Sequence, residues 1–135
     1  MNDIELAKAL GLFSLGLGAV EVTAPWSLIR LLGLPRSAAL VRGFGAREIG
    51  AGVAGLLYPD SPAPIWARVG GDVLDLAVLG WALRRGNPRR GAAGVATAAV
   101  LAITALDVLC ATSMTGRQAR VSRTAQRTRV VPAAG

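Results

Sequence analysis

Ionisable residues interrupt every apolar stretch of this chain. Each of the four stretches contains at least one acidic residue, and the second and third also contain arginines. Charged groups cannot face lipid, so if these stretches cross a bilayer the charges must converge inside a helical bundle. We therefore expect an internal charge cluster with eight members, namely Glu21, Arg42, Arg47, Glu48, Arg68, Asp72, Asp75 and Asp107.

The position of each charged residue along its helix predicts which residues form ion pairs. With antiparallel neighbours and a rise of about 1.5 Å per residue, Glu21 lies level with Arg42, and Arg68 lies level with Asp107. We predict one ion pair at each of these levels. The middle of the bundle then holds Arg47 among three carboxylates, those of Glu48, Asp72 and Asp75.

Two kinds of chemistry fit such a cluster. Buried charges are retained when they form ion pairs, so the cluster can stabilise the packing of the helices against one another. However, five acidic residues face three arginines, and an unpaired carboxylate in a membrane interior favours binding a proton or a cation. The first interpretation predicts a non-enzymatic anchor or assembly component. The second, which stays open, predicts a small proton- or cation-coupled transporter that uses intramembrane carboxylates.

Enzymatic and metal chemistry are not expected. The chain has no histidine, which removes the commonest metal ligand and the usual general base at neutral pH. Di-metal sites in four-helix bundles use Glu-x-x-His pairs, which are therefore excluded. The single cysteine, Cys110, lies among apolar neighbours and is interpreted as a packing residue. We predict no cofactor, no metal site and no catalytic residue.

The composition indicates a membrane protein. The chain is 53% hydrophobic, its mean hydropathy is +0.49 and it contains 17 glycines; glycine is commoner in transmembrane helices than in soluble ones. The longest charge-free run, 91–106, is shorter than the 18 residues that identify a spanning helix by themselves. The alternative is a soluble bundle with a buried salt-bridge network. Each helix shows one narrow polar stripe instead of the broad charged face of a soluble helix, which favours the membrane.

Proline and apolar periodicity delimit the helices. The predicted long helices cover 4–23, 37–58, 65–83 and 91–114, and a short helix at the membrane interface covers 26–34. The fold class is therefore all-α, a four-helix transmembrane bundle with a short interfacial helix between helices 1 and 2. Residues 1–115 form the membrane domain, and 116–135 form a basic, disordered tail.

The net charge of +7 comes mainly from arginines that flank the apolar stretches. Basic residues in this position meet anionic headgroups, so we expect anionic lipids as partners. No aromatic residue accompanies the basic tail, so nucleic acid is not expected as a partner. Six basic residues on each side give no orientation preference. The residues assigned to the membrane surface are Arg84, Arg85, Arg89, Arg90, Arg117 and Arg120.

Two motifs lie in the second and third stretches. Gly45-Ala46-Arg47-Glu48-Ile49 has the form Gly-x-Arg-Glu-Ile, and 68–76 has the form Arg-x-x-Gly-Asp-x-x-Asp-Leu. Over residues 6–114 the chain resembles an uncharacterised bacterial four-helix membrane domain, often found ahead of polyketide cyclase/dehydrase-like (START-like) lipid-binding domains. The resemblance implies that the motif charges matter, but it brings no known activity. No globular segment is expected after residue 115.

The hydropathy pattern predicts a multi-pass membrane protein, and the resemblance implies the bacterial inner membrane as its location. The resemblance also implies a separate lipid-binding protein as the partner, and a second copy of the chain is a further candidate.

Overall fold

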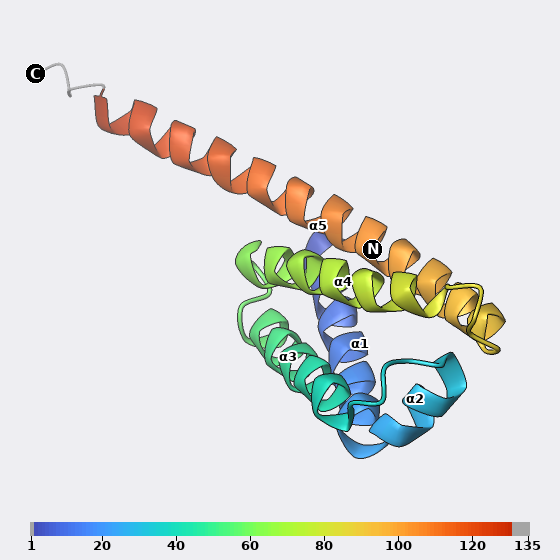
Figure 1. Cartoon of the computed structure of the whole chain (residues 1–135). Helices are drawn as coiled ribbons and strands as arrows, with labels where there is room; N and C mark the ends of the chain where they lie inside the picture. The colour runs from blue at the N-terminus through green and yellow to red at the C-terminus, as the bar shows by residue number, and fades with distance from the viewer. Residues whose placement is uncertain (1, 131–135) are drawn as a thin grey trace, which may run out of the picture.

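The computed structural model describes residues 2–130 and is all-helical over that range (Figure 1). The helices are α1 (Asp3–Thr23), α2 (Pro25–Leu32), α3 (Ala38–Leu57), α4 (Ala63–Ala82) and α5 (Arg90–Val130). The prediction of an all-α chain with four long helices and a short one after the first is confirmed. The bounds of the first four helices differ from the predicted ones by at most two residues.

Local sequence signals explain where the helices begin and end. Asn2 and Glu5 form a capping box, in which each side chain accepts a hydrogen bond from the backbone N–H of the other residue. The Ser37 hydroxyl caps α3 by accepting from the Leu40 N–H at 3.2 Å. Gly33 ends α2 with a φ of 64°, a left-handed conformation that favours glycine.

The long helix α5 corrects one prediction. Residues 116–130, expected to be disordered, continue the helix, while 131–135 lie outside the described residues. Arginine, glutamine and alanine have high helix propensity, and no proline interrupts the segment before Pro132. Arg117 also forms an ion pair with Asp3 of α1. With 41 residues α5 is about 60 Å long, and Figure 1 shows it projecting past the other helices.

The closest helix contact is between α1 and α3, which run antiparallel. A Cβ atom added to Gly18 would lie 2.6 Å from the carbonyl oxygen of Gly45, and one added to Gly52 would lie 2.7 Å from that of Gly11. Four glycines therefore let the two backbones touch at two points seven residues apart. Helix α4 packs mainly against α5 and also contacts α3, so the four long helices enclose a common interior.

The interior contains charged side chains beside a small apolar cluster that includes Leu10, Ile65 and Met114, while many large apolar side chains are exposed. Arg68 is the largest fully buried side chain, and Glu48, Asp72 and Asp107 are also buried. Large apolar residues cover the outside of every long helix; examples are Leu12, Val53, Val73 and Leu101. By length and composition, α1 and α5 are each apolar enough to cross a membrane.

Candidate functional site

The buried and half-buried charges come from three helices and meet a hydroxyl from the fourth. Helix α3 supplies Arg47 and Glu48, α4 supplies Arg68, Asp72 and Asp75, and α5 supplies Asp107. Ser14 of α1 completes the group. Helical spacing explains the arrangement on α4, because residues three and four positions apart share one face.

Arg68 and Asp107 form the most buried ion pair. The Arg68 Nε donates to Asp107 Oδ1 at 3.0 Å, and Nη2 donates to Oδ2 at 3.1 Å. The exposed fractions of the two side chains are only 1% and 0%. The predicted pair is therefore confirmed, with the two-pronged geometry that makes arginine–carboxylate pairs strong.

Glu48 joins the pair to the rest of the network. Its Oε2 accepts from Ser14 Oγ at 2.5 Å and from Arg68 Nη1 at 3.4 Å, and its Oε1 accepts from Arg47 Nη2 at 2.8 Å. Both carboxylate oxygens are thus occupied by donors from α1, α3 and α4. Ser14 shares a helix face with Gly11 and Gly18, so the glycine contacts between α1 and α3 bring its hydroxyl within reach of Glu48.

Arg47 carries the network across to Asp75. Its Nη2 donates to Asp75 Oδ2 at 2.8 Å, and its Nη1 donates to the Gly71 carbonyl at 2.7 Å. A Cβ on Gly71 would lie 2.6 Å from the Arg47 Cζ, so the guanidinium occupies the space that a larger residue at this position would fill. Arg47, predicted to lie among three carboxylates, therefore pairs with two of them, Glu48 and Asp75. The result is one continuous chain of charges, Asp75–Arg47–Glu48–Arg68–Asp107.

The predicted ion pair between Glu21 and Arg42 is wrong. Arg42 is exposed, and its Nε donates to the Val22 carbonyl at 3.3 Å, in the last turn of α1. A cation is favourable there because the C-terminal end of a helix carries partial negative charge. Glu21 lies against Gly45, because a Cβ added to Gly45 would lie 2.8 Å from the Glu21 Cβ. Arg42 therefore bonds the backbone at the end of α1 and not the Glu21 carboxylate, although the two residues lie at the same depth.

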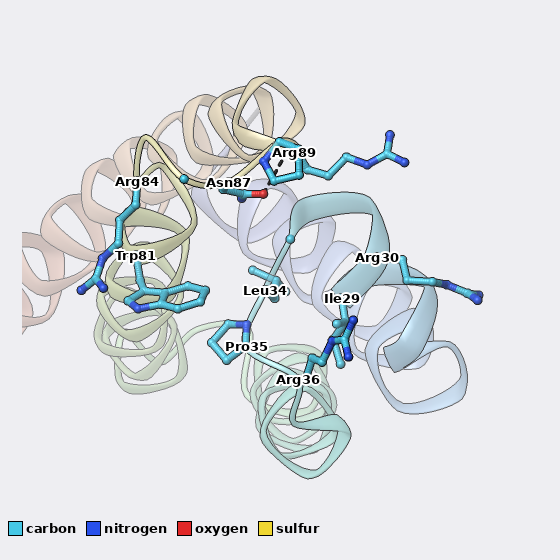
Figure 2. A pocket seen from close by; sticks show the side chains of 12 residues that line it. Ile29, Arg30, Leu34, Pro35, Arg36, Trp81, Arg84, Asn87 and Arg89 are labelled. Carbon is cyan, nitrogen blue, oxygen red and sulfur yellow. Dashed lines mark hydrogen bonds between the residues drawn. The ribbon is translucent and has the colours of Figure 1, made fainter.

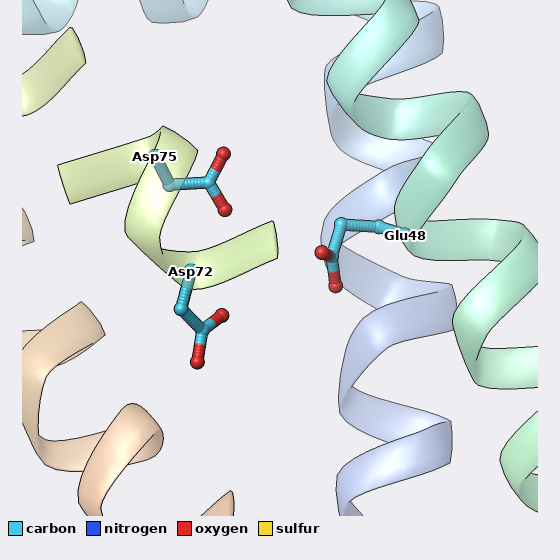
Figure 3. Close-up of side chains that lie close together, drawn as sticks. All are labelled: Glu48, Asp72 and Asp75. Atoms are coloured by element: carbon cyan, nitrogen blue, oxygen red, sulfur yellow. The ribbon is translucent and has the colours of Figure 1, made fainter. Parts of the chain in front are cut away.

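Three carboxylates in the described part of the chain each have one buried oxygen without a hydrogen-bond partner: Glu21 Oε2, Asp72 Oδ2 and Asp75 Oδ1. Figure 3 shows Asp72 and Asp75 on α4 facing Glu48 on α3. One oxygen from each of these three residues lies within 4.8 Å of the others. Because both Glu48 oxygens and one Asp75 oxygen already accept from arginine or serine, we assign no metal to this group.

A small apolar cavity reaches two of these carboxylates. It has a volume of about 120 Å³, and Glu21 and Asp75 lie in its wall. The rest of the lining is mainly apolar, with Leu28, Phe44 and Val100 contributed by α2, α3 and α5. The cavity thus gives the interior a space beside two carboxyl groups that have an unpartnered oxygen.

The arginines assigned to the membrane surface lie at both ends of the helices. Five of them, Arg84, Arg85, Arg89, Arg90 and Arg120, are exposed and make no ion pair within residues 2–130. Arg117 pairs with Asp3, which the sequence did not indicate. Contact of these residues with lipid stays a prediction.

Comparison of the chain with protein-family models, with curated proteins and with solved structures yields no match. The function has to be inferred from the geometry. Two contributors to the network, Ser14 and Gly71, were missed at the level of the sequence. The small-residue face of α1 could have suggested Ser14, whereas no sequence signal marks the Gly71 carbonyl as an acceptor.

Proposed function

We propose that this protein is a non-enzymatic, multi-pass integral membrane protein in which α1, α3, α4 and α5 cross the bilayer. The observation that carries the proposal is the burial of charged side chains, with Arg68 as the largest fully buried one, together with the exposure of many leucine, valine and phenylalanine side chains. In water this arrangement leaves apolar surface unburied, and in lipid it is the favourable one. The charge network then holds the spanning helices together.

The helix dimensions support four spans. Helices α1, α3 and α4 have 20 or 21 residues, or about 30 Å, which matches the hydrocarbon core of a bilayer. The charged residues that lower the hydropathy of α3 and α4 are mostly those of the buried network. In the apolar windows of α1 and α5 only 28% and 17% of residues are buried, unlike the core helices of a soluble protein.

The part of α5 beyond Met114 supports a role as an anchor or assembly component. This extension, residues 115–130, adds about 24 Å of helix beyond the bundle. Arg117, Arg120, Arg123 and Arg127 follow at intervals of three and four, so they share one face. Such a face suits an acidic partner. The resemblance to a bacterial membrane domain favours the inner membrane as the location and a separate lipid-binding protein as the partner.

Cysteine accessibility tests this topology. In a Cys110→Ser background, we expect a membrane-impermeant maleimide to label Ser61→Cys and Ser122→Cys from one side and Gly86→Cys from the other. Ser61 and Gly86 lie at opposite ends of α4, and Ser122 lies on the α5 extension, at the same end as Ser61. Leu12→Cys, Val53→Cys, Val73→Cys and Leu101→Cys, one per long helix, should stay unlabelled, since each faces lipid. Sealed vesicles of both orientations provide the measurement.

Labelling after solubilisation in denaturant is the control, because every cysteine must then react. Labelling of the four lipid-facing positions in intact vesicles contradicts the spanning arrangement. Protection of Ser122→Cys contradicts an aqueous α5 extension and with it the assembly surface.

A second function, proton- or cation-coupled transport, is favoured by one specific observation. Three buried carboxylate oxygens lack a partner, and a cavity lies beside two of those carboxylates. Counting only the interior, five acidic residues accompany two arginines, since Arg42 is exposed. Binding of protons or cations would offset the excess negative charge.

Proton flux in liposomes under an imposed pH gradient tests this second function. We expect wild type to exceed empty liposomes and Glu21→Gln and Asp72→Asn to lose the excess, because both changes remove a titrating group without breaking an ion pair. Asp60→Asn, at an exposed loop position, is the matched control and should retain it. Wild-type flux equal to that of empty liposomes, with a panel of candidate substrates present, contradicts transport and leaves the anchor function in place.

A further inference from the structure

A second cavity lies at the end of the bundle opposite the α5 extension. This basic pocket, of about 720 Å³, is formed between the α2–α3 connection and the α4–α5 turn. Figure 2 shows its polar and aromatic lining. The residues that matter below are Arg30, Arg36, Trp81, Arg84, Asn87 and Arg89.

Asn87 fixes the shape of the basic pocket. Its Nδ2 donates to the carbonyls of Leu32 at 3.0 Å and Ala82 at 2.6 Å, and its Oδ1 accepts from the Arg89 N–H at 2.9 Å. The same side chain occupies the space where a Cβ on Gly33 would lie, and Gly33 has a positive φ. The two connections are therefore held together, so the pocket is formed before any ligand binds.

All of the charged side chains that line the basic pocket are positively charged. Four arginines line it and no acidic residue does. None of the four makes an ion pair with any residue between 2 and 130. Arg84 lies over the Trp81 ring at 5.4 Å from the ring centroid. Figure 2 shows Arg30, Arg84 and Arg89 extending outward from the mouth of the pocket in different directions, with Arg36 nearer to its centre. Helices α3 and α5 also begin immediately beyond Arg36 and Arg89, so partial positive charge adds to that of the side chains.

We propose that the basic pocket binds the phosphate headgroup of an anionic phospholipid. Arginine matches phosphate oxygens in charge and geometry, and its planar group donates two parallel hydrogen bonds. A lipid is favoured over a free phosphate because Trp81 is an interfacial residue type and because exposed Leu31 and Leu83 adjoin the pocket residues Arg30 and Arg84 in sequence, offering apolar surface to the acyl chains. This inference rests on the membrane placement proposed above.

Quenching of Trp81 fluorescence by brominated lipids tests the proposal. Trp26→Phe with Trp66→Phe leaves Trp81 as the sole tryptophan. In phosphatidylcholine nanodiscs, we expect brominated phosphatidylglycerol to quench Trp81 more than brominated phosphatidylcholine at equal mole fraction, with an association constant roughly tenfold higher. Arg36→Gln with Arg89→Gln should remove this preference. Arg85→Gln with Arg90→Gln, which removes the same charge from outside the lining, should keep it.

Each result has one interpretation, provided that circular dichroism shows each variant to be helical. Equal quenching by both lipids in wild type overturns the basic pocket as a lipid site but leaves Trp81 in the bilayer. No quenching by either lipid contradicts the membrane placement instead. Equal losses in the two double variants indicate general surface attraction and overturn the pocket. Displacement of phosphatidylglycerol by millimolar glycerol phosphate also overturns the lipid source, because the site then takes a soluble phosphate ester.

Discussion

Replacing Arg68 with alanine is expected to lower the free energy of unfolding by about 3–5 kcal/mol, because the change leaves a buried carboxylate uncompensated. Asp107 is fully buried and receives both of its ion-pair hydrogen bonds from Arg68. Asp107→Ala leaves the buried guanidinium with only the longer contact to Glu48, so a comparable loss is expected. The double variant should lose less than the sum of the two single losses, since neither charge is then stranded.

Unfolding in mixed detergent micelles, followed by circular dichroism, provides the measurement. Arg42→Ala is the matched control, because it removes an arginine from the same bundle that only contacts the end of α1. Its expected loss is about 0.3–1 kcal/mol. Additive losses of stability from Arg68→Ala and Asp107→Ala would contradict an energetic coupling between the two residues. A loss from Arg42→Ala as large as that from Arg68→Ala would show that the buried network contributes no more to stability than an exposed arginine does.

The contrast between Arg68 and Arg42 shows what the sequence can specify. Comparing the depths of residues in adjacent helices predicts the Arg68–Asp107 pair correctly. The short turn between α4 and α5 fixes both the relative height and the relative rotation of these two helices. The comparison fails for Glu21 and Arg42 because depth does not determine which acceptor a long side chain reaches. Gly45 lies against the Glu21 Cβ, and Arg42, one turn before it, donates to the Val22 carbonyl instead of the Glu21 carboxylate.

The α5 extension was missed for a different reason. A polar, arginine-rich segment cannot bury enough apolar surface to fold alone, and this predicts disorder. The segment does not fold alone, however, because it continues a helix that has already formed. Nucleation is already complete in the apolar part of α5, so each added residue requires only favourable propensity. The eight predicted interior charges are otherwise gathered as expected, apart from Arg42, and under the proposed membrane placement this arrangement hides them from lipid.

Substitutions at the glycine contacts between α1 and α3 are expected to cause the second large loss of stability. Gly45→Ala together with Gly52→Ala is expected to lower the free energy of unfolding by about 1–3 kcal/mol for each site. The added Cβ atoms would lie 2.7 Å from the carbonyl oxygens of Gly18 and Gly11, which are backbone atoms that cannot rotate away. The helices must separate, and the 2.5 Å hydrogen bond from Ser14 to Glu48, which lies between the two contacts, must lengthen.

The same helix supplies the matched control. Gly43 and Gly50 also lie on α3, but an added Cβ would meet nothing within 4 Å. Gly43→Ala with Gly50→Ala should leave stability unchanged or raise it slightly, because alanine has the higher helix propensity. Both double variants add two methyl groups to α3, so hydrophobicity and propensity are matched and only the contact with α1 differs. Equal stability of the two double variants in the same micelle assay would show that α1 and α3 do not meet at these glycines, and the position of Ser14 beside Glu48 would then lose its cause.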